Sequence, residues 1–421
     1  MGHGPHGQSQ SLDSLDSRDI DTSKQRGCDD ASYTLFGMTR SGMTGCGMTT
    51  LIVATALFVC GESACQNCDK VSSWGLDPSE WSVEHPPCDA TEIRLPPTGT
   101  TSIWTVSNMR NFVVYDDNRE PLNGSNIYLY DLNTCVEYAI TNRPWGDVSP
   151  CIWEHSVVFA GTANTAGKLE PVLFDMANLS FTRPISGLPG YGPLFNGRYL
   201  LYKALDKTTE EDSCRYATRL HLRDLSTGEE LLLTERWQEV EEEASSLSPT
   251  HAAWVAWNGS ERNVFFMDLE TKDINHIQTT SEPDFSYTAT WGDWVLWEDW
   301  RNENAEIYGW RISTSEEARI TNNGVWNGRP TLRGGIACYR TGSLWDPTVG
   351  WDLMVRDMET GVERQVTQET NVGYKCGNVD SGWLVYLKQT MSNYTYVNSI
   401  HAVNLVVAGI LDPSGEHVVP E

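Results

Sequence analysis

The sequence is short of positive charge, of long hydrophobic stretches and of recognisable catalytic motifs. Lys and Arg total 30 against 57 Asp and Glu, a net charge of −27, which argues against a nucleic acid or an anionic membrane surface as partner. The membrane-like segment 51–59 has only nine apolar residues, too few to span a bilayer. Neither Gly-x-Ser-x-Gly, His-Glu-x-x-His nor a phosphate-binding glycine loop occurs. Cationic and neutral partners remain compatible with this net charge.

The apolar run 51–59 matches the central region of a secretory signal and is followed at once by Cys60-Gly61. The stretch before it is polar and aperiodic, so we expect translation to start at Met38 or Met43. Residues 57–60 resemble a bacterial lipobox, although Val59 stands where a small residue is usual. This resemblance implies that Cys60 is the lipidated N-terminus of the mature chain. Simple secretion, or a buried strand in a cytosolic protein, is the alternative.

Cysteine usage also favours export. Three of the 11 cysteines lie in or before the signal, which leaves eight. An even number in an exported chain is compatible with disulfides, but the sequence does not assign the pairs. Cys65 and Cys68 form one CxxC without the second CxxC that a zinc site needs, so no metal and no cofactor is expected. The eight are Cys65, Cys68, Cys88, Cys135, Cys151, Cys214, Cys338 and Cys376.

One short pattern occurs seven times: a run of β-forming residues, then an acidic or amide residue, then Leu, Met or Ile. The fifth copy carries Arg311 in the acidic position. The polar residues stand at 131, 175, 224, 268, 311, 357 and 404, so the steps are 44, 49, 44, 43, 46 and 47. A period of this length is typical of four-stranded propeller blades. The sequence therefore predicts an all-β fold, a seven-bladed β-propeller, as one domain.

Each period divides into four strands, which we letter A to D outward from the propeller axis. In the fifth unit they are 287–291, 294–298, 306–310 and 318–321, with the turn Gly292-Asp293 between A and B. The B strands read as nearly continuous apolar runs. Such runs indicate strands buried on both faces, between neighbouring blades.

The seventh unit lacks a strand D after Leu405, but segment 91–95 upstream of the first unit is similar to the other D strands. We therefore expect 91–95 to become the outermost strand of the last blade and close the ring, which removes an exposed edge. The predicted organisation is a disordered extension with signal peptide (1–59), a tether (60–89), the propeller (90–411) and a C-terminal tail (412–421).

The turn between strands B and C carries a further motif. Asp299-Trp-Arg301-Asn302 followed by Ile307-Tyr308 resembles the TolB-type propeller repeats of bacterial periplasmic and surface proteins, and the first unit matches with an insertion. The resemblance covers about residues 90–411 and implies the fold rather than a function, because such repeats are scaffolds for unrelated tasks. TolB itself has six blades and an extra domain, neither of which is seen here, so its partners do not transfer.

Candidate site residues come from the loops. Trp300, Trp326 and Trp345 fall outside the expected strands, where they would suit stacking on a sugar ring or a partner protein, and Arg301 is the charged residue beside them. The pairs Asp117/Arg119 and Asp299/Arg301 have a structural reading, in which Asp accepts turn amides and Arg pairs with a neighbouring blade. A ligand-binding carboxylate and guanidinium is the alternative.

Two other polar sets have plain readings. The histidines are scattered through the units without metal-ligand spacing, although propeller polysaccharide lyases do hold a metal with histidines that project into the axis. The acid run 239–243 is expected in a solvated connection between the third and fourth units, with a cation site as the alternative. The histidines are His155, His221, His251, His276 and His401.

These features favour an exported, lipid-anchored, monomeric propeller in the periplasm or on the cell surface, which binds a protein or carbohydrate and catalyses nothing. Its only membrane contact would be the lipid. The alternative function is that of a polysaccharide lyase or hydrolase with an axial active site. The alternative location is that of a simply secreted protein. Three histidines, or paired carboxylates at a catalytic separation, converging on the axis would indicate the enzyme.

Overall fold

The structure is a computed structural model, and it describes most of the chain from residue 91 onward. Within this part no helix has the length and apolar character needed to cross a membrane. The predicted signal, Cys60 and the tether lie outside the described residues. The described ranges are 91–95, 103–119, 124–143, 146–162, 168–185, 190–207, 216–234, 239–257, 262–277, 287–342, 350–369, 372–392 and 395–420.

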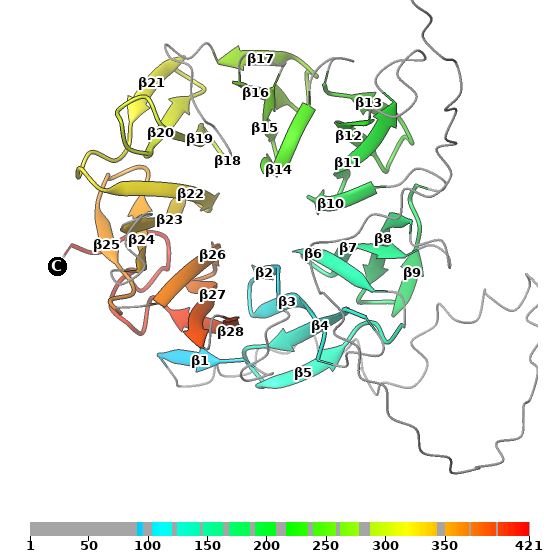
Figure 1. The fold of residues 1–421 in the computed structure, drawn as a ribbon, viewed down its shortest axis with the longest axis horizontal. Coiled ribbons are helices and arrows are strands. Elements are labelled where there is room, and N and C mark those ends of the chain that lie inside the picture. Colours follow the sequence, from blue (N-terminus) through cyan, green and yellow to red (C-terminus); the bar gives the residue numbers. More distant parts are fainter. Residues whose placement is uncertain are drawn as a thin grey trace, which may run out of the picture. The chain divides into compact units, whose positions relative to one another are not determined.

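The described strands form seven antiparallel sheets of four strands each, arranged in a ring (Figure 1). Six sheets take consecutive strands in order from the axis outward, which confirms the predicted seven-bladed propeller. The first three blades are β2 (Val106–Met109), β3 (Phe112–Asp117), β4 (Asn126–Asp131) and β5 (Val136–Ala139); β6 (Asp147–Trp153), β7 (Ser156–Thr162), β8 (Leu169–Asp175) and β9 (Ser180–Thr182); β10 (Gly190–Phe195), β11 (Tyr199–Lys207), β12 (Tyr216–Asp224) and β13 (Glu230–Leu232).

The remaining blades follow the same order until the last, which borrows its outer strand. They are β14 (Glu239–Leu247), β15 (His251–Trp257), β16 (Arg262–Asp268) and β17 (Ile274–Ile277); β18 (Thr288–Trp291), β19 (Trp294–Asp299), β20 (Glu306–Arg311) and β21 (Glu316–Arg319); β22 (Trp326–Arg333), β23 (Ile336–Gly342), β24 (Trp351–Asp357) and β25 (Glu363–Gln365); β26 (Val372–Asp380), β27 (Trp383–Ser392), β28 (Thr395–Asn404) and β1 (Glu92–Arg94).

The ring closes through β1, as the sequence predicts. β1 pairs antiparallel with β28 in the register Ile93 to Ala402, and Figure 1 shows the blue β1 arrow beside the red β28. Two backbone hydrogen bonds extend the pairing: Leu95 N donates to Ile400 O at 2.9 Å, and Asn404 N donates to Thr91 O at 2.9 Å. Covering the edge of β28 removes a template for unwanted strand addition.

The sevenfold repeat has a direct structural cause at the foot of each blade. In every blade, the N–H of the repeated Leu, Met or Ile donates to a carbonyl of the A–B turn at 2.8–2.9 Å; for Leu132 the acceptor is Asn111 O. The preceding Asp accepts the amides of the C–D turn, as Asp131 does from Asn133 N at 2.9 Å. The motif therefore ties two turns together, which explains why it recurs once per period.

The fifth blade shows why its Arg is tolerated. Arg311 cannot accept turn amides, and Asp293 of the A–B turn takes over this role: Ser313 N donates to Asp293 Oδ1 at 2.7 Å. Arg311 Nε lies 2.9 Å from Asp293 Oδ2. The acidic partner has thus moved to the other turn, and the link between the two turns is kept.

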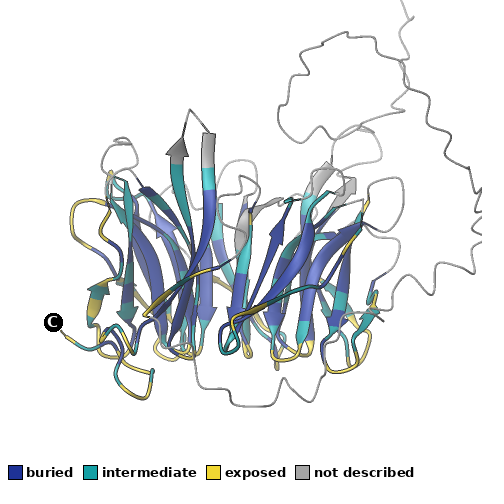
Figure 2. Ribbon diagram, turned by 90° about the horizontal axis from the view of Figure 1, so that it is seen from below, coloured by how far each residue is buried: buried dark blue, intermediate teal, exposed yellow. Residues whose placement is uncertain are grey.

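The hydrophobic core lies between the blades. All six residues of β3 are buried, and the large rings Trp254 and Trp297, on the B strands of neighbouring blades, share one cluster. Figure 2 shows the buried residues along the middle of the strands and the exposed ones at the turns of one edge. The B strands are therefore buried on both faces, as their continuous apolar runs predict.

Two expectations near the ends of units need correction or refinement. The acid run 239–243 does not lie in a connection, because its residues form the start of the innermost strand β14. β14 pairs with β15 through an irregularity between Val240 and Ser245, which interrupts the regular ladder there.

The tail after β28 folds back on the ring: Val418 is buried in the cluster between the sixth and seventh blades, and Arg364 Nη1 donates to Val419 O at 3.0 Å.

Candidate functional site

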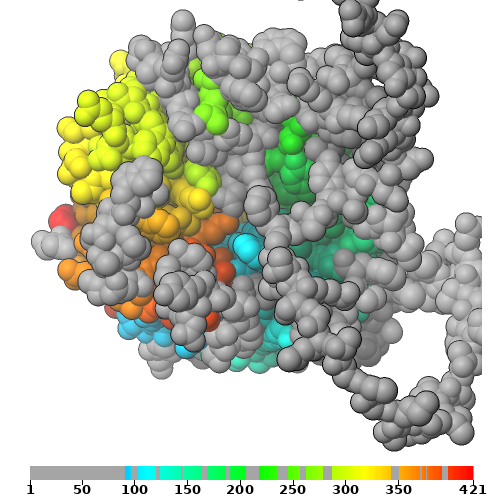
Figure 3. Space-filling view, viewed as in Figure 1, coloured from blue at the N-terminus to red at the C-terminus, as the bar shows by residue number. Residues whose placement is uncertain are grey.

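The innermost strands of all seven blades surround one pocket on the propeller axis, with a volume of about 290 Å³. Figure 3 shows residues of the first blade, in cyan, near the centre beside the orange-red last blade. Its lining contains Thr105, Ser107, Cys151, Trp153, Phe195, Ser246, Tyr287, Thr290, Trp291, Arg329, Arg333, Arg340, Lys375 and Asn378. A concave site at the centre of a scaffold is the usual place for a ligand.

One end of the axis is filled by two tryptophan rings and an arginine in close contact. Trp153 and Trp291 end strands β6 and β18 of blades on opposite sides of the ring, yet their ring centroids are 6.2 Å apart. The guanidinium carbon of Arg333, at the end of β22, lies 5.3 Å and 5.5 Å from the two centroids. Arg333 Nε is 2.6 Å from Asp380 Oδ2 in the seventh blade, and its Nη1 donates to Asn108 O in the first at 3.0 Å. Arg333 thus links five blades.

Cationic side chains contribute to the pocket lining. Four cationic side chains, Arg329, Arg333, Arg340 and Lys375, contribute to the lining, and the described lining residues include no Asp or Glu. Arg340 is 3% exposed.

A β-bulge in β22 places Arg329 in the pocket. The register of β22 and β23 shifts between Gly328 and Thr331, and Arg329 within the bulge has φ 53°. Gly328 must be glycine, since a Cβ there would lie 2.4 Å from Glu298 Oε2. Glu298 Oε2 accepts the backbone N–H of Arg329 at 3.0 Å. Burial raises the pKa of Glu298, while the hydrogen bond from Arg329 opposes that rise.

An exposed tryptophan stands next to the opposite end of the pocket. Trp104 is 66% exposed, which is the largest exposed fraction among the exposed large hydrophobic side chains of the described residues. The residue after it, Thr105, lines the pocket and precedes β2. Lys375 Nζ lies 3.5 Å from Trp104 O. A bare indole and cationic side chains therefore occur together at this end.

A buried carboxyl supports the pocket wall from behind. Asp116 on β3 is fully buried, its Oδ1 accepts the N–H of Thr105 at 2.7 Å, and its Oδ2 has no hydrogen-bond partner. Burial raises the pKa of Asp116 to about 7, and the bond from Thr105 and the charge of Lys375 lower it less. Because no described group donates a hydrogen bond to Oδ2, a protonated carboxyl group fits this site.

The raised pKa of Asp116 predicts a pH-dependent stability. Between about pH 4 and 7 the folded state keeps the Asp116 proton and the unfolded state releases it. In this range the free energy of unfolding therefore falls by about 1.4 kcal/mol for each unit by which the pH rises. We expect Asp116→Asn to gain stability relative to wild type from pH 4 to 8, measured by urea unfolding. Asp273→Asn, at an exposed position, is the control. Equal pH profiles for wild type and Asp116→Asn would contradict the assignment.

Two of the three tryptophans predicted from the sequence lie in the described part of the chain, and neither lines the axial pocket. Trp300 donates its indole N–H to Glu298 Oε1 at 3.1 Å. Trp326 is buried and starts strand β22, so its expected place in a loop is wrong. Trp345 lies outside the described residues. Neither Trp300 nor Trp326 is among the described residues that line the axial pocket, and binding by all three tryptophans stays a prediction.

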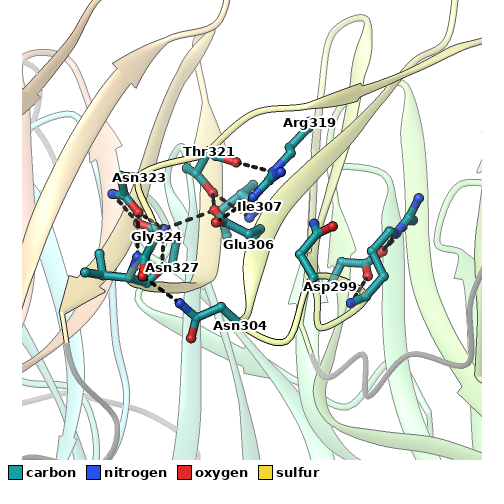
Figure 4. A network of polar contacts seen from close by, with 12 residues as sticks. Asp299, Asn304, Glu306, Ile307, Arg319, Thr321, Asn323, Gly324 and Asn327 are labelled. Atoms are coloured by element: carbon teal, nitrogen blue, oxygen red, sulfur yellow. Dashed lines mark hydrogen bonds and ion pairs between the residues drawn. The ribbon is translucent and has the colours of Figure 1, made fainter.

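Arg301 serves its own blade. Arg301 Nε donates to Asp299 Oδ2 at 2.9 Å, and Arg301 Nη1 lies 2.7 Å from Glu317 Oε1 on β21. Figure 4 shows Asp299 beside the polar network of Glu306 and Thr321. Asp299 also accepts the Arg301 backbone N–H at 2.9 Å, so the turn-amide part of the prediction is confirmed. Glu317 belongs to the same sheet, so this described contact lies within the blade, and the expected pairing with a neighbouring blade stays a prediction. A role of Arg301 in binding remains a prediction.

Arg119 repeats this arrangement in the first blade. Its Nε lies 2.5 Å from Asp117 Oδ2 and its Nη1 2.7 Å from Glu137 Oε2 on β5. The guanidinium covers the Tyr128 ring at 3.8 Å, as Arg301 covers Tyr308 at 4.1 Å. The shared Asp-x-Arg motif therefore joins strand B to strand D of one blade.

The described histidines do not gather at the axis, and no described group of His, Cys, Asp and Glu is arranged to hold a metal ion. His401 Nδ1 is 2.7 Å from Glu92 of the closing strand, and its ring stacks on Tyr386. His276 contacts Asn263 on the neighbouring strand. His221 lies near Glu230 and His251 near Asp268. These contacts give four of the five histidines local partners within their blades.

The cysteines combine disulfides with a free thiol. Cys135 and Cys338 are disulfide-bonded, whereas Cys151, in the pocket lining, is free. Burial raises the pKa of the Cys151 thiol, which keeps it protonated and a poor nucleophile. The even count of eight does not therefore mean that all eight are paired.

Sequence reasoning missed the axial residues. A signal was present: three innermost strands contain a Pro directly after a residue of positive φ, at Ser149-Pro150, Gly192-Pro193 and Arg329-Pro330. Pro has no N–H for the ladder and is found in strands at bulges. Alignment of the units on these prolines would have singled out Arg329.

No protein-family model matches the chain, and no curated protein matches it. Solved structures do. TolB from Acinetobacter baumannii is 16% identical, over 69% of this chain and 80% of that one, with a TM-score of 0.38. The β-propeller domain of the Trilobed protease from Pyrococcus furiosus is 12% identical over 72% and 95%, with a TM-score of 0.54. Puromycin hydrolase is 13% identical over 76% and 55%, with a TM-score of 0.55.

The likenesses with TM-scores of 0.54 and 0.55 show the fold alone. The chain spans about half the length of puromycin hydrolase, 55%, and two structures of acylaminoacyl peptidase from Pyrococcus horikoshii, 50% and 52%. The Pyrococcus furiosus domain is described as having an open velcro topology, whereas here β1 and β28 pair and close the ring. The chain is therefore a β-propeller of the kind that occurs in several unrelated contexts.

Proposed function

We propose that this protein is an exported, lipid-anchored, non-catalytic propeller that binds a carbohydrate at the bacterial cell envelope through its axial pocket. The observation that carries the proposal is the pocket itself, which is built from all seven blades and lined by cationic and aromatic side chains. The TolB-type motif and the apolar run before Cys60 support the envelope location.

The chemistry of the lining favours binding over catalysis. General acid–base catalysis of glycoside cleavage needs a pair of carboxyl groups, or a His or Tyr placed on the reacting atom. The described lining has no His, Asp or Glu, and its one tyrosine, Tyr287, has the Arg329 guanidinium carbon 4.5 Å from its ring centroid. Its thiol, Cys151, is held protonated by burial. Arg and Trp side chains orient and stack on a ligand without taking up its protons.

The size of the site favours a sugar over a protein surface. A volume of about 290 Å³ lies at the lower end for small-molecule sites, whereas a stable protein interface needs about 800 Å² from each partner. The exposed ring of Trp104 beside the pocket offers a stacking surface of the kind used for sugar rings. A protein that presents a glycan is compatible with the same site.

The test is capture by the immobilised propeller from an envelope extract. We expect retained carbohydrate, identified by mass spectrometry, and a several-fold smaller yield with the double variant Arg329→Gly, Lys375→Ala. Arg94→Ala removes one positive charge on the exposed face of β1 and serves as the control, with an unchanged yield. Equal capture of carbohydrate by wild type and double variant, or capture of a bare protein, would refute the proposal.

The lipid anchor has its own test. Cys60 lies outside the described residues, and the proposal depends on the apolar run 51–59 that ends before it. Expressed in a bacterial host, the wild type should partition into the detergent phase and Cys60→Ser should stay aqueous, because stable anchoring needs more than one acyl chain. If both stay aqueous with an N-terminus beyond Cys60, the protein is simply secreted.

A further inference from the structure

We infer that the C-terminal tail, residues 406–420, is a pH-responsive latch. It ties the sixth blade to the seventh at the foot of the ring while His417 is protonated, and it loosens when His417 loses its proton. The inference is independent of what the axial pocket binds. It is carried by the buried anchor of the tail, by a missing side chain in the sixth blade, and by the carboxylates around His417.

The tail crosses from the seventh blade to the sixth and is anchored between them. It follows β28, and Figure 1 shows its red end beside β25 of the sixth blade. Leu411 and Val418 are 2% and 4% exposed and pair in a β-bridge. Both belong to the cluster that Ile336 of the sixth blade and Leu384 of the seventh share. The anchor keeps the tail close to the seam, so that a single polar contact can decide how firmly it docks.

The repeat shows why the sixth blade has room for a contact from the tail. In the first blade, Asn111 Nδ2 of the A–B turn donates to the repeated Asp131 Oδ1 at 2.5 Å. In the third, Arg198 Nη2 of the same turn donates to Asp224 Oδ2 at 2.6 Å. The A–B turn of the sixth blade consists of two glycines, residues 334–335. It therefore has no side chain to offer to the repeated Asp of its own blade.

His417 of the tail takes that place on the sixth blade. Its Nδ1 lies 3.0 Å from Asp357 Oδ2, while Asp357 Oδ1 accepts the turn amides of Glu359 and Thr360 at 2.8 Å and 3.0 Å. The side chain of Asp357 is 2% exposed and that of His417 is 46% exposed. The carboxylate is thus fixed by its own blade, and the imidazole titrates in contact with solvent.

The charges around His417 favour its protonated form. Asp357 and Glu359 of the sixth blade and Asp412 of the tail act on it, and the hydrogen bond to Asp357 raises the pKa of His417. A pocket beside it has Asp357, Glu359 and Glu416 in its described lining, and no Lys or Arg. The seventh blade adds no titratable group to that described lining.

The docked tail binds the His417 proton more tightly than a free tail does. Docking is therefore strongest below the ordinary pKa of histidine, and it weakens as the pH rises through the raised pKa of His417. Three arginines lie on strands of the sixth blade, and each bonds to a group other than His417: Arg364 to Val419 O, Arg333 to Asp380, and Arg356 to Glu363.

Hydrogen exchange of the full chain, followed by mass spectrometry, measures whether the tail is docked. Two backbone bonds determine its protection: Asp412 N donates to His417 O and Val419 N to Ile410 O, both at 2.9 Å. We expect the protection of segment 410–419, corrected for the intrinsic exchange rate, to fall from about pH 5.5 to about pH 8.5. The fall should be about two- to fivefold, because the contact that titrates is a surface ion pair.

Two substitutions of His417 separate its proton from the fold. In His417→Gln the glutamine keeps a donor for Asp357 and does not titrate, so the tail should be equally protected at both pH values. His417→Ala removes the contact, and its tail should be as weakly protected at the lower pH as the wild-type tail is at the higher. The matched control is His276→Gln on β17, also at an exposed position, which should keep the pH dependence of the wild type.

Any other pattern overturns the inference. Equal protection of the wild-type tail at both pH values, or protection that rises with pH, removes the pH response. A His417→Gln variant that loses protection as the wild type does assigns the response to another group. A His417→Ala variant protected like the wild type at the lower pH shows that the contact with Asp357 does not hold the tail. A wild-type tail without protection at either pH removes the latch itself.

Discussion

Replacing Leu95 by Asp is expected to open the propeller. Leu95 is fully buried in the cluster that joins the last blade to the first, and its N–H bonds to Ile400 O at 2.9 Å. An aspartate there would bring an unpaired carboxylate into the seam and release β1 from β28. We expect a loss of roughly 3–5 kcal/mol in unfolding free energy and a lower soluble yield, because the exposed edge of β28 invites aggregation.

The control for Leu95→Asp adds the same side chain on the same segment. Thr91 is exposed and contributes its carbonyl oxygen to the pairing, so Thr91→Asp should cost less than about 0.5 kcal/mol. Thermal and urea unfolding of both variants, with size-exclusion chromatography, make the comparison. If Leu95→Asp were as stable as Thr91→Asp, the pairing of β1 with β28 would not contribute to ring stability.

Replacing Arg333 by Met is expected to have an effect of similar size at the axis. Methionine keeps the apolar stem but leaves the carboxylate of Asp380, 13% exposed, without its cation. It also removes the guanidinium that lies 5.3 Å and 5.5 Å from the ring centroids of Trp153 and Trp291. Breaking a buried pair in this way costs about 3–5 kcal/mol. The tryptophan emission should shift to the red as water reaches the axis.

Two further variants show whether the Arg333–Asp380 pair is the cause. The double variant Arg333→Met, Asp380→Asn should recover part of the loss, because the amide carries no unpaired charge. Arg311→Met removes a comparable pair at the surface, where Arg311 and Asp293 are 53% and 35% exposed, and should cost less than about 1 kcal/mol. An Arg333→Met protein as stable as Arg311→Met would show that the axial stack is not needed to hold the blades together.

The comparison of sequence and structure is most informative where a prediction was wrong. The acid run 239–243 was expected in a connection because charged residues are rare in buried strands, but it opens β14, the innermost strand of the fourth blade. Strand A of a propeller borders the axial space, so composition alone does not identify it as a strand. Trp326 was expected in a loop because it falls outside the strands assigned from the sequence, yet it starts β22 and is buried.

The sequence by itself determined the period, the number of blades, the buried B strands and the closing role of segment 91–95. These are local properties: each unit repeats the same turn contacts, such as Leu132 N to Asn111 O, and the same apolar runs, so each can be recognised within its own 43–49 residues.

Only the tertiary structure decided which side chains meet at the axis. Trp153, Trp291 and Arg333 come from three different units, and nothing in the spacing of 138 residues between the two tryptophans indicates that their rings lie 6.2 Å apart. Strand position and bulge geometry determine which residues point inward, and closure of the ring then brings all seven inner strands to one line. A site assembled in this way depends on the ring as a whole, because no single blade contains it.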